Sequence, residues 1–151
     1  MFDDLKFATD LWKRLAPYVP QTIKIPISIY SDLIENWSPI GLNERFRFYR
    51  YSGNQKFAPH YDGTYQRSQD EASQVTFMVY LNQEFTGGET KFYLNHPYGE
   101  IAIKPQAGMA LCFLHNLRHE GTTVKEGTKY VLRTDIMYRR TIVRQQSSIF
   151  S

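Results

Sequence analysis

The stretch Ala58-Pro59-His60-Tyr61-Asp62-Gly63 holds residues whose types and spacing could do chemistry. His60 and Asp62 are two positions apart, so on an extended strand both side chains point to the same face. An imidazole and a carboxylate on one face are two thirds of the 2-His-1-carboxylate facial triad, which holds Fe(II) and leaves coordination positions open. A His-x-Asp triplet is also an ordinary surface strand end, so the interpretation depends on a third ligand elsewhere in the chain.

Three other histidines could supply that ligand: His96, His115 and His119. His96 lies in Asn-His-Pro, a turn sequence, and is predicted to be a surface residue. His115 and His119 flank a loop at the end of an apolar stretch, and spacing alone does not separate them. We favour His119 because it begins His-Glu-Gly, which leads through a turn at 126–127 to the last predicted strand.

The last predicted strand, 128–138, carries charged side chains on one face. That face holds Lys129, Val131, Arg133, Asp135 and Met137, and the other holds Tyr130, Leu132, Thr134, Ile136 and Tyr138. A solvated edge strand would show this alternation. A barrel lining that binds an anion would show it equally, so both interpretations stay open at this point.

The composition limits the class of protein. A chain of 151 residues fits one domain, 1–151, with a real hydrophobic core. The net charge of +3, without a Lys/Arg run, gives no reason to expect nucleic-acid binding. No apolar run reaches membrane length and no signal peptide is recognised, so no membrane association is expected. The single cysteine, Cys112, excludes an internal disulfide framework, which favours a cytoplasmic location, and Cys112 is predicted to be a small core residue.

The N-terminal part is expected to support the rest of the chain. Asp3 or Asp4 can cap a helix over 5–15 that has apolar residues on one side. Pro26 predicts that a strand within 21–31 lies at a sheet edge. Residues 32–37 are expected to form a helical turn, and the tail from Thr141 is left unassigned.

From Arg45 onward the pattern is a series of strands separated by turn signals. The expected strands are 45–51, 57–62, 74–82, 89–94, 100–104, 109–114 and 128–138. The polar segment 63–73 is expected to be a mobile loop beside the site. These features predict a mainly β fold, a double-stranded β-helix (jelly roll) with N-terminal helices packed on one sheet and a core of about 45–138.

Several of these stretches resemble one enzyme family. They are Arg50-Tyr51-Ser52-Gly53-Asn54, Phe57-Ala58-Pro59-His60-Tyr61-Asp62, Tyr80-Leu81-Asn82, Gly87-Gly88-Glu89-Thr90, His119-Glu-Gly and Lys129-Tyr130. In this order, from about Arg45 to Tyr138, they are similar to the Fe(II)/2-oxoglutarate-dependent dioxygenases, and nearest to the prolyl 4-hydroxylase-like branch.

The resemblance implies a role for each matching residue. It implies Fe(II) binding by His60, Asp62 and His119, and binding of the distal carboxylate of 2-oxoglutarate by Lys129, ten positions after His119. Tyr80 and Tyr51 are expected to lie beside this co-substrate.

Arg133 has no counterpart in much of the prolyl branch. It is expected to contribute to catalysis or co-substrate binding by facing the C1 carboxylate of 2-oxoglutarate, the prime substrate, or Asp135 as a structural partner. Arg133 is four positions beyond Lys129 on one strand, so the two are about 13 Å apart and are not expected to share one carboxylate.

The family reaction hydroxylates a C–H bond with O₂ and releases succinate and CO₂. The expected partners are 2-oxoglutarate, O₂ and a prime substrate, for which a peptidyl prolyl or another amino-acid residue is the family-level candidate, with ascorbate as a candidate reductant. One alternative is a non-catalytic jelly-roll module that binds a metal or a polar ligand. Another is a zinc hydrolase with the same three ligands, but no general base is apparent and the sequence has no His-Glu-x-x-His.

Overall fold

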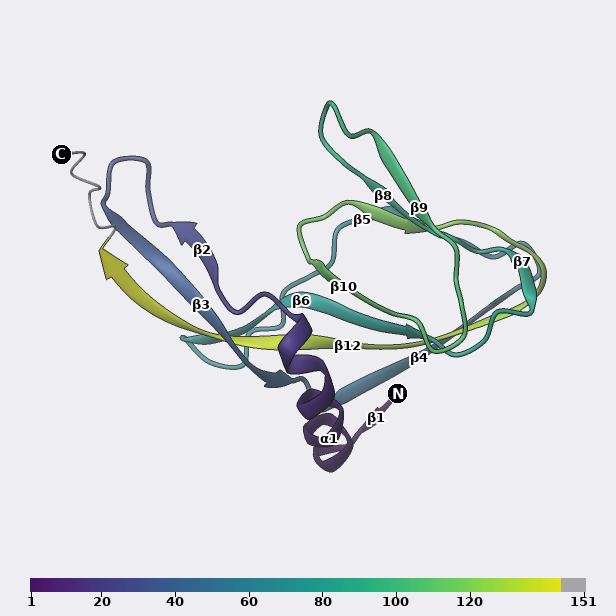
Figure 1. The fold of residues 1–151 in the computed structure, drawn as a ribbon, viewed down its shortest axis with the longest axis horizontal. Helices are drawn as coiled ribbons and strands as arrows, with labels where there is room; N and C mark the ends of the chain where they lie inside the picture. Colours follow the sequence, from purple (N-terminus) through teal and green to yellow (C-terminus); the bar gives the residue numbers. More distant parts are fainter. Residues whose placement is uncertain (145–151) are drawn as a thin grey trace.

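The computed structural model describes residues 1–144, which form two antiparallel sheets (Figure 1). The large sheet consists of β1 (Phe2–Asp3), β2 (Ile23–Pro26), β3 (Leu33–Leu42), β4 (Arg45–Ser52), β6 (Glu71–Tyr80), β7 (Phe85–Gly87), β10 (Ala110–Leu114) and β12 (Val124–Arg144). The small sheet consists of β5 (Phe57–His60), β11 (His119–Gly121), β8 (Thr90–Tyr93) and β9 (Glu100–Ile103), in that spatial order. Side chains of both sheets line one pocket between them, so the jelly-roll prediction is confirmed.

Strand β12 is the centre of the large sheet. It pairs with β4 and β6 along its middle, with β7 at its start and with β3 at its end. Its side chains alternate as the sequence predicts. Leu132, Ile136 and Tyr138 point into the core on one face, while Lys129 and Arg133 line the pocket on the other.

The helix α1 (Leu5–Leu15) covers part of the outer face of the large sheet (Figure 1). Asp4 caps it, because its carboxylate accepts a hydrogen bond of 2.8 Å from the Phe7 amide. A 3₁₀ turn, η1 (Ala16–Tyr18), follows. The core under the helix consists of Ala8, Leu15, Val19, Trp37, Leu42, Phe46, Ala72, Val75, Phe77, Leu132, Ile136 and Tyr138. Within residues 1–144, neither helical segment has the length and apolar character of a membrane span.

The expected helical turn at 32–37 is wrong, because residues 33–37 belong to β3 and Asp32 lies in the bend before it. Ile34 pairs with Val143 and Trp37 pairs with Arg140, so β3 is held by the final segment of β12. Residues up to Arg144 of the unassigned tail therefore form a strand, and 145–151 lie outside the described part. Such long-range pairing overrides local propensity.

Three further expectations need correction. The turn at 126–127 lies inside β12, where these residues pair with β7. The end of the expected loop 63–73 is already strand, since β6 begins at Glu71. Cys112 is exposed rather than buried, because β10 pairs only with β6 among the described strands and α1 does not cover its outer face.

Candidate metal centre and adjoining pocket

The pairing of β5 with β11 brings His60 and His119 together. They are direct cross-strand partners, and such partners project to the same face of a sheet. Asp62 follows β5 by two residues. One ligand atom from each of the three lies within 4.8 Å of the other two. His60 Nε2 is 3.4 Å from Asp62 Oδ1, and His119 Nε2 is 3.7 Å from Asp62 Oδ2.

Backbone carbonyls fix the tautomer of both imidazoles. His60 Nδ1 lies 2.8 Å from the Ala58 carbonyl oxygen, and His119 Nδ1 lies 2.8 Å from that of Leu117. A carbonyl only accepts, so each Nδ1 carries the proton and each Nε2 presents a lone pair. Burial also lowers the pKa of His119, and the buried His60 Nε2 has no hydrogen-bond partner within residues 1–144.

The Asp62 carboxylate is held from two sides. Thr76 Oγ1 donates to its Oδ2 over 2.5 Å, and Arg133 Nη2 lies 2.7 Å from its Oδ1. Burial opposes ionisation of this carboxyl, but the hydrogen bond from Thr76 and the charge of Arg133 outweigh it and lower its pKa. An ionised carboxylate and two imidazole lone pairs suit Fe(II), so the residues present fit the metal that the sequence predicts.

The other two histidines lie outside this cluster. His115 is buried behind it, with Nδ1 3.0 Å from Thr76 Oγ1 and Nε2 2.9 Å from Ser73 Oγ, and is therefore occupied by protein partners. His96 is exposed.

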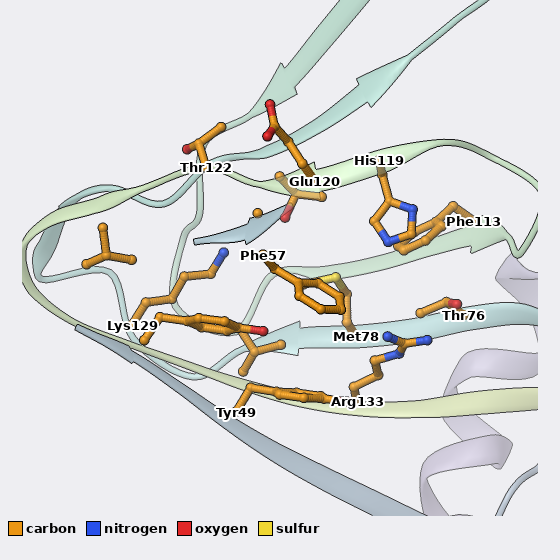
Figure 2. A pocket seen from close by; sticks show the side chains of 15 residues that line it. Tyr49, Phe57, Thr76, Met78, Phe113, His119, Glu120, Thr122, Lys129 and Arg133 are labelled. Carbon is orange, nitrogen blue, oxygen red and sulfur yellow. The ribbon is translucent and has the colours of Figure 1, made fainter. Parts of the chain in front are cut away.

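An elongated pocket extends from His119, one member of this cluster, between the two sheets. Figure 2 shows Lys129 at one end and His119 with Arg133 at the other. Phe57 and Met78 line the section between the two ends. A pocket with polar groups at both ends and apolar walls suits a short molecule that carries a charge at each end.

Lys129 is a buried cation with neutral partners. Its ammonium donates to the Gly88 carbonyl oxygen over 2.6 Å and lies 5.1 Å above the Tyr80 ring and 5.8 Å above the Tyr51 ring. It forms no ion pair with a carboxylate of residues 1–144. Burial lowers the pKa of Lys129 to about 8, and the charge of Glu89 opposes that shift only in part.

The two tyrosines named from the sequence differ in their access to the pocket. Tyr51 lines it, whereas Tyr80 is fully buried and donates its hydroxyl to Thr90 Oγ1 over 2.6 Å. Thr90 lines the pocket in its place. The sequence reasoning missed Thr90, and it missed the contact of Thr76, although Thr76 shares the inward face of the predicted strand 74–82 with Tyr80.

Arg133 lies at the metal end of the pocket. Its contact with Asp62 is much shorter than its 4.0 Å approach to Asp135 Oδ1. Arg133 Nε and Asp135 Oδ1 are both buried and have no hydrogen-bond partner in the described part of the chain.

A second, more open hollow, which we call the outer groove, adjoins the metal cluster. Its walls include Arg47, Tyr49, Tyr61, Tyr65, Arg133 and Asp135, together with His60 and Asp62. The outer groove thus reaches the cluster at His60 and Asp62, whereas the pocket reaches it at His119.

Comparison with family profiles identifies one family. The profile of the 2OG-Fe(II) oxygenase superfamily matches residues 46–134. A crystal structure of a Pseudomonas putida prolyl-4-hydroxylase is similar over 68% of this chain and 55% of its own, with a TM-score of 0.53 and 22% identity. An oxidoreductase of the 2OG-Fe(II) oxygenase family from Burkholderia pseudomallei is similar over 87% of this chain and 78% of its own, with a TM-score of 0.51 and 13% identity.

These structural similarities support the fold. This chain spans 55% of the length of the Pseudomonas putida protein. A search of curated proteins gives no significant match.

Proposed function

The chain belongs to the 2OG-Fe(II) oxygenase superfamily, and from this premise we propose that it is an Fe(II)- and 2-oxoglutarate-dependent dioxygenase. The observation that carries the proposal is that one pocket joins two kinds of site. A His60, Asp62 and His119 cluster suited to Fe(II) lies at one end, and a buried lysine without a carboxylate partner in the described chain lies at the other.

His60, Asp62 and His119 would hold the metal through His Nε2 atoms and a carboxylate oxygen. The bound iron, with 2-oxoglutarate and O₂, supplies an oxidation that releases succinate and CO₂ and hydroxylates a C–H bond. The protein keeps both imidazoles neutral at Nε2 through the Ala58 and Leu117 carbonyl groups.

Lys129 would bind the distal carboxylate of 2-oxoglutarate. Its ammonium is already fixed by the Gly88 carbonyl and by the faces of two tyrosine rings, so little side-chain entropy is left to lose on binding. A hydrogen bond to a charged group in a buried site is stronger than the same contact in water. Tyr51 and Thr90 would line this end, and Tyr80 would act through Thr90.

Arg133 would hold Asp62 in the orientation that the metal requires. Its bond to Oδ1 stabilises the ionised carboxylate, and its remaining N–H groups could contact the C1 carboxylate of 2-oxoglutarate or the prime substrate. The approach to Asp135 is long for a structural ion pair.

The prime substrate would occupy the outer groove. Arg133 and Asp135 are in its wall, so charged groups of both signs face a molecule bound there. A peptidyl prolyl or another amino-acid residue, the candidate that the family implies, is the proposed substrate. Ascorbate as a reductant and a cytoplasmic location complete the proposal, the latter supported by the single cysteine.

The test is Fe(II)-dependent formation of succinate from 2-oxoglutarate, followed by mass spectrometry of candidate peptides for a gain of one oxygen atom. His119→Ala should lose both signals, and His96→Ala, at an exposed histidine, should keep them. Metal binding without succinate formation under any condition would instead favour the non-catalytic binding module.

A further inference from the structure

His115 is part of a continuous chain of hydrogen bonds that ends at Asp62. Thr76 Oγ1 lies 2.5 Å from Asp62 Oδ2 and 3.0 Å from His115 Nδ1. His115 Nε2 lies 2.9 Å from Ser73 Oγ, which accepts a hydrogen bond of 2.8 Å from the Tyr65 backbone amide. Ser73, Thr76 and His115 are all at most 5% exposed, so water does not compete for these groups.

Burial lowers the pKa of His115 and so favours the neutral imidazole, and with a neutral imidazole only one arrangement of protons satisfies every link of this chain. The ionised Asp62 carboxylate accepts, so Thr76 must use its single hydroxyl proton there. Thr76 therefore accepts from His115 Nδ1–H, and His115 Nε2 must accept the hydroxyl proton of Ser73. Ser73 in turn accepts from the Tyr65 amide. These hydrogen bonds thus fix the tautomer of the neutral imidazole, with its proton on Nδ1.

The far end of this chain holds a loop that borders the outer groove. Residues 61–70, which include Asp62, connect β5 to β6. Tyr61 and Tyr65 of this loop are in the wall of the outer groove. Tyr65 is tied to Ser73 twice, since the Ser73 amide also donates to the Tyr65 carbonyl over 2.9 Å. The Asp62 amide donates to the His115 carbonyl over 3.0 Å, so the His115 backbone holds the start of this segment, and its side chain is linked to Tyr65 through Ser73.

We propose that His115 is a positioning residue that couples the orientation of the Asp62 carboxylate to the conformation of loop 61–70. Metal binding at Asp62 then orders the loop that faces the prime substrate, and an ordered loop strengthens metal binding, because such coupling is reciprocal. This inference rests on the metal site proposed above. It adds a role for three buried residues, Ser73, Thr76 and His115, that are not metal ligands.

The first test measures Mn(II) affinity by calorimetry, without turnover. In His115→Asn the side-chain amide nitrogen takes the place of Nδ1 and can still donate to Thr76, but no atom takes the place of Nε2. In His115→Gln the longer side chain reaches the place of Nε2, near Ser73, and Thr76 has no donor. Thr76→Val and His115→Gln should raise the Kd for Mn(II) about 10- to 100-fold, as expected for the loss of a group that orients a metal ligand. His115→Asn should raise it less than about fivefold, and His96→Gln, at an exposed site, should leave it unchanged.

The second test measures hydrogen exchange of loop 61–70. Mn(II) should slow exchange of the Tyr65 amide in the wild-type protein. Ser73→Ala and His115→Asn should speed this exchange, and in both variants Mn(II) should no longer slow it, although the metal still binds. If His115 only filled space, its replacement would change the Kd for Mn(II) and the exchange rate of the Tyr65 amide together.

The outcomes distinguish the possible failures. Equal Kd values for Asn and Gln at position 115, in proteins with unchanged circular dichroism, would overturn the directional chain. An unchanged response of the loop to Mn(II) in His115→Asn would overturn the coupling. If the wild-type protein does not bind Mn(II), the metal site itself is wrong, whereas normal binding by the wild type and all variants would contradict only the role of His115.

Discussion

At the metal end of the pocket the Asp62 carboxylate already has a cation, Arg133, and a hydroxyl donor, Thr76, whereas Lys129 at the other end has neutral partners only. The pKa of Asp62 is therefore lowered, which favours its charged form, while burial lowers the pKa of Lys129 to about 8, which disfavours its charged form. At the metal end the charge of the Asp62 carboxylate is therefore already compensated by protein groups. The Lys129 end becomes complete only when an anion binds.

This difference predicts how the two ends respond to change. Removing a group from the metal end breaks a preformed set of ligands and should affect every step that needs the metal. Changing the Lys129 end should affect the affinity for 2-oxoglutarate and leave metal binding intact. The three metal-ligand candidates lie on or directly after β5 and on β11, whereas Lys129 lies on β12, and Lys129 forms no hydrogen bond with them among residues 1–144.

The largest effect is expected from the metal cluster. His60→Ala, Asp62→Ala and His119→Ala should each abolish Fe(II)-dependent succinate formation, because each supplies one of only three protein ligands. Circular dichroism should show that the fold is kept. Retained activity in His119→Ala together with loss in His115→Ala would mean that the distal ligand has been assigned to the wrong histidine.

The next largest effect is expected at the other end of the pocket. Lys129→Ala should raise the KM for 2-oxoglutarate about 10- to 100-fold, the loss expected for a charge-assisted contact of about 1.5–3 kcal/mol. Its Kd for Mn(II) should stay unchanged. Arg133→Lys should do the opposite, weakening metal binding and coupled hydroxylation more than the affinity for 2-oxoglutarate. If Arg133→Lys raises the KM for 2-oxoglutarate more than Lys129→Ala does, the roles of Lys129 and Arg133 are the reverse of those proposed.

A smaller effect is expected from pH. With a pKa of about 8, Lys129 is charged below that value and loses its proton as the pH rises through it. The Kd for 2-oxoglutarate should be flat below about pH 7, roughly double by pH 8 and then rise further, approaching about tenfold per pH unit. Of the other titratable groups around it, Tyr51 and Tyr80 have a pKa of about 12 and stay neutral, and Glu89 stays ionised because its pKa is lowered.

Lys129→Arg is the control for this pH profile, because a guanidinium stays charged across the whole range. Calorimetry of the Mn(II)-loaded proteins should give a flat profile for this variant. A rise above pH 8 that persists in Lys129→Arg would assign the titration to another group.

The sequence predicted those parts of the site that depend on short-range spacing. The alternation of 128–138 correctly separates Lys129 and Arg133 from the core residues, because side-chain direction in a strand follows from position alone. The His60-x-Asp62 spacing correctly brings two polar groups to one place. The jelly roll follows from many short strands after a helix.

The parts that depend on distant pairing could not be predicted in the same way. Residues 33–42 form a strand only because the end of β12 lies beside them. The roles of Thr76 and His115 depend on a contact between β6 and the loop after β10, far apart in the sequence. Cys112 lies in an apolar stretch, which predicts a core residue. It is exposed because β10 pairs only with β6 among the described strands and lies outside the core that α1 covers.

The smallest effect is expected at Gly88, whose carbonyl accepts from Lys129. Gly88 has a φ of +70°, and a Cβ there would lie 3.0 Å from Val124 Cγ2 and 3.3 Å from Lys129 Cδ. Gly88→Ala should lower the free energy of unfolding by about 1–2 kcal/mol, because an L side chain is disfavoured at this φ. It should also raise the KM for 2-oxoglutarate about threefold by displacing the lysine stem.

Gly99→Ala separates these two consequences. Gly99 has a similar φ of +66°, but a Cβ there meets no atom within 4 Å. This control should lose comparable stability in thermal unfolding while its KM for 2-oxoglutarate stays at the wild-type value. If both variants raise the KM equally, the effect comes from general destabilisation. If only Gly88→Ala raises it, and its Kd for Mn(II) is unchanged, the turn at Gly88 fixes Lys129 for the co-substrate independently of the metal end.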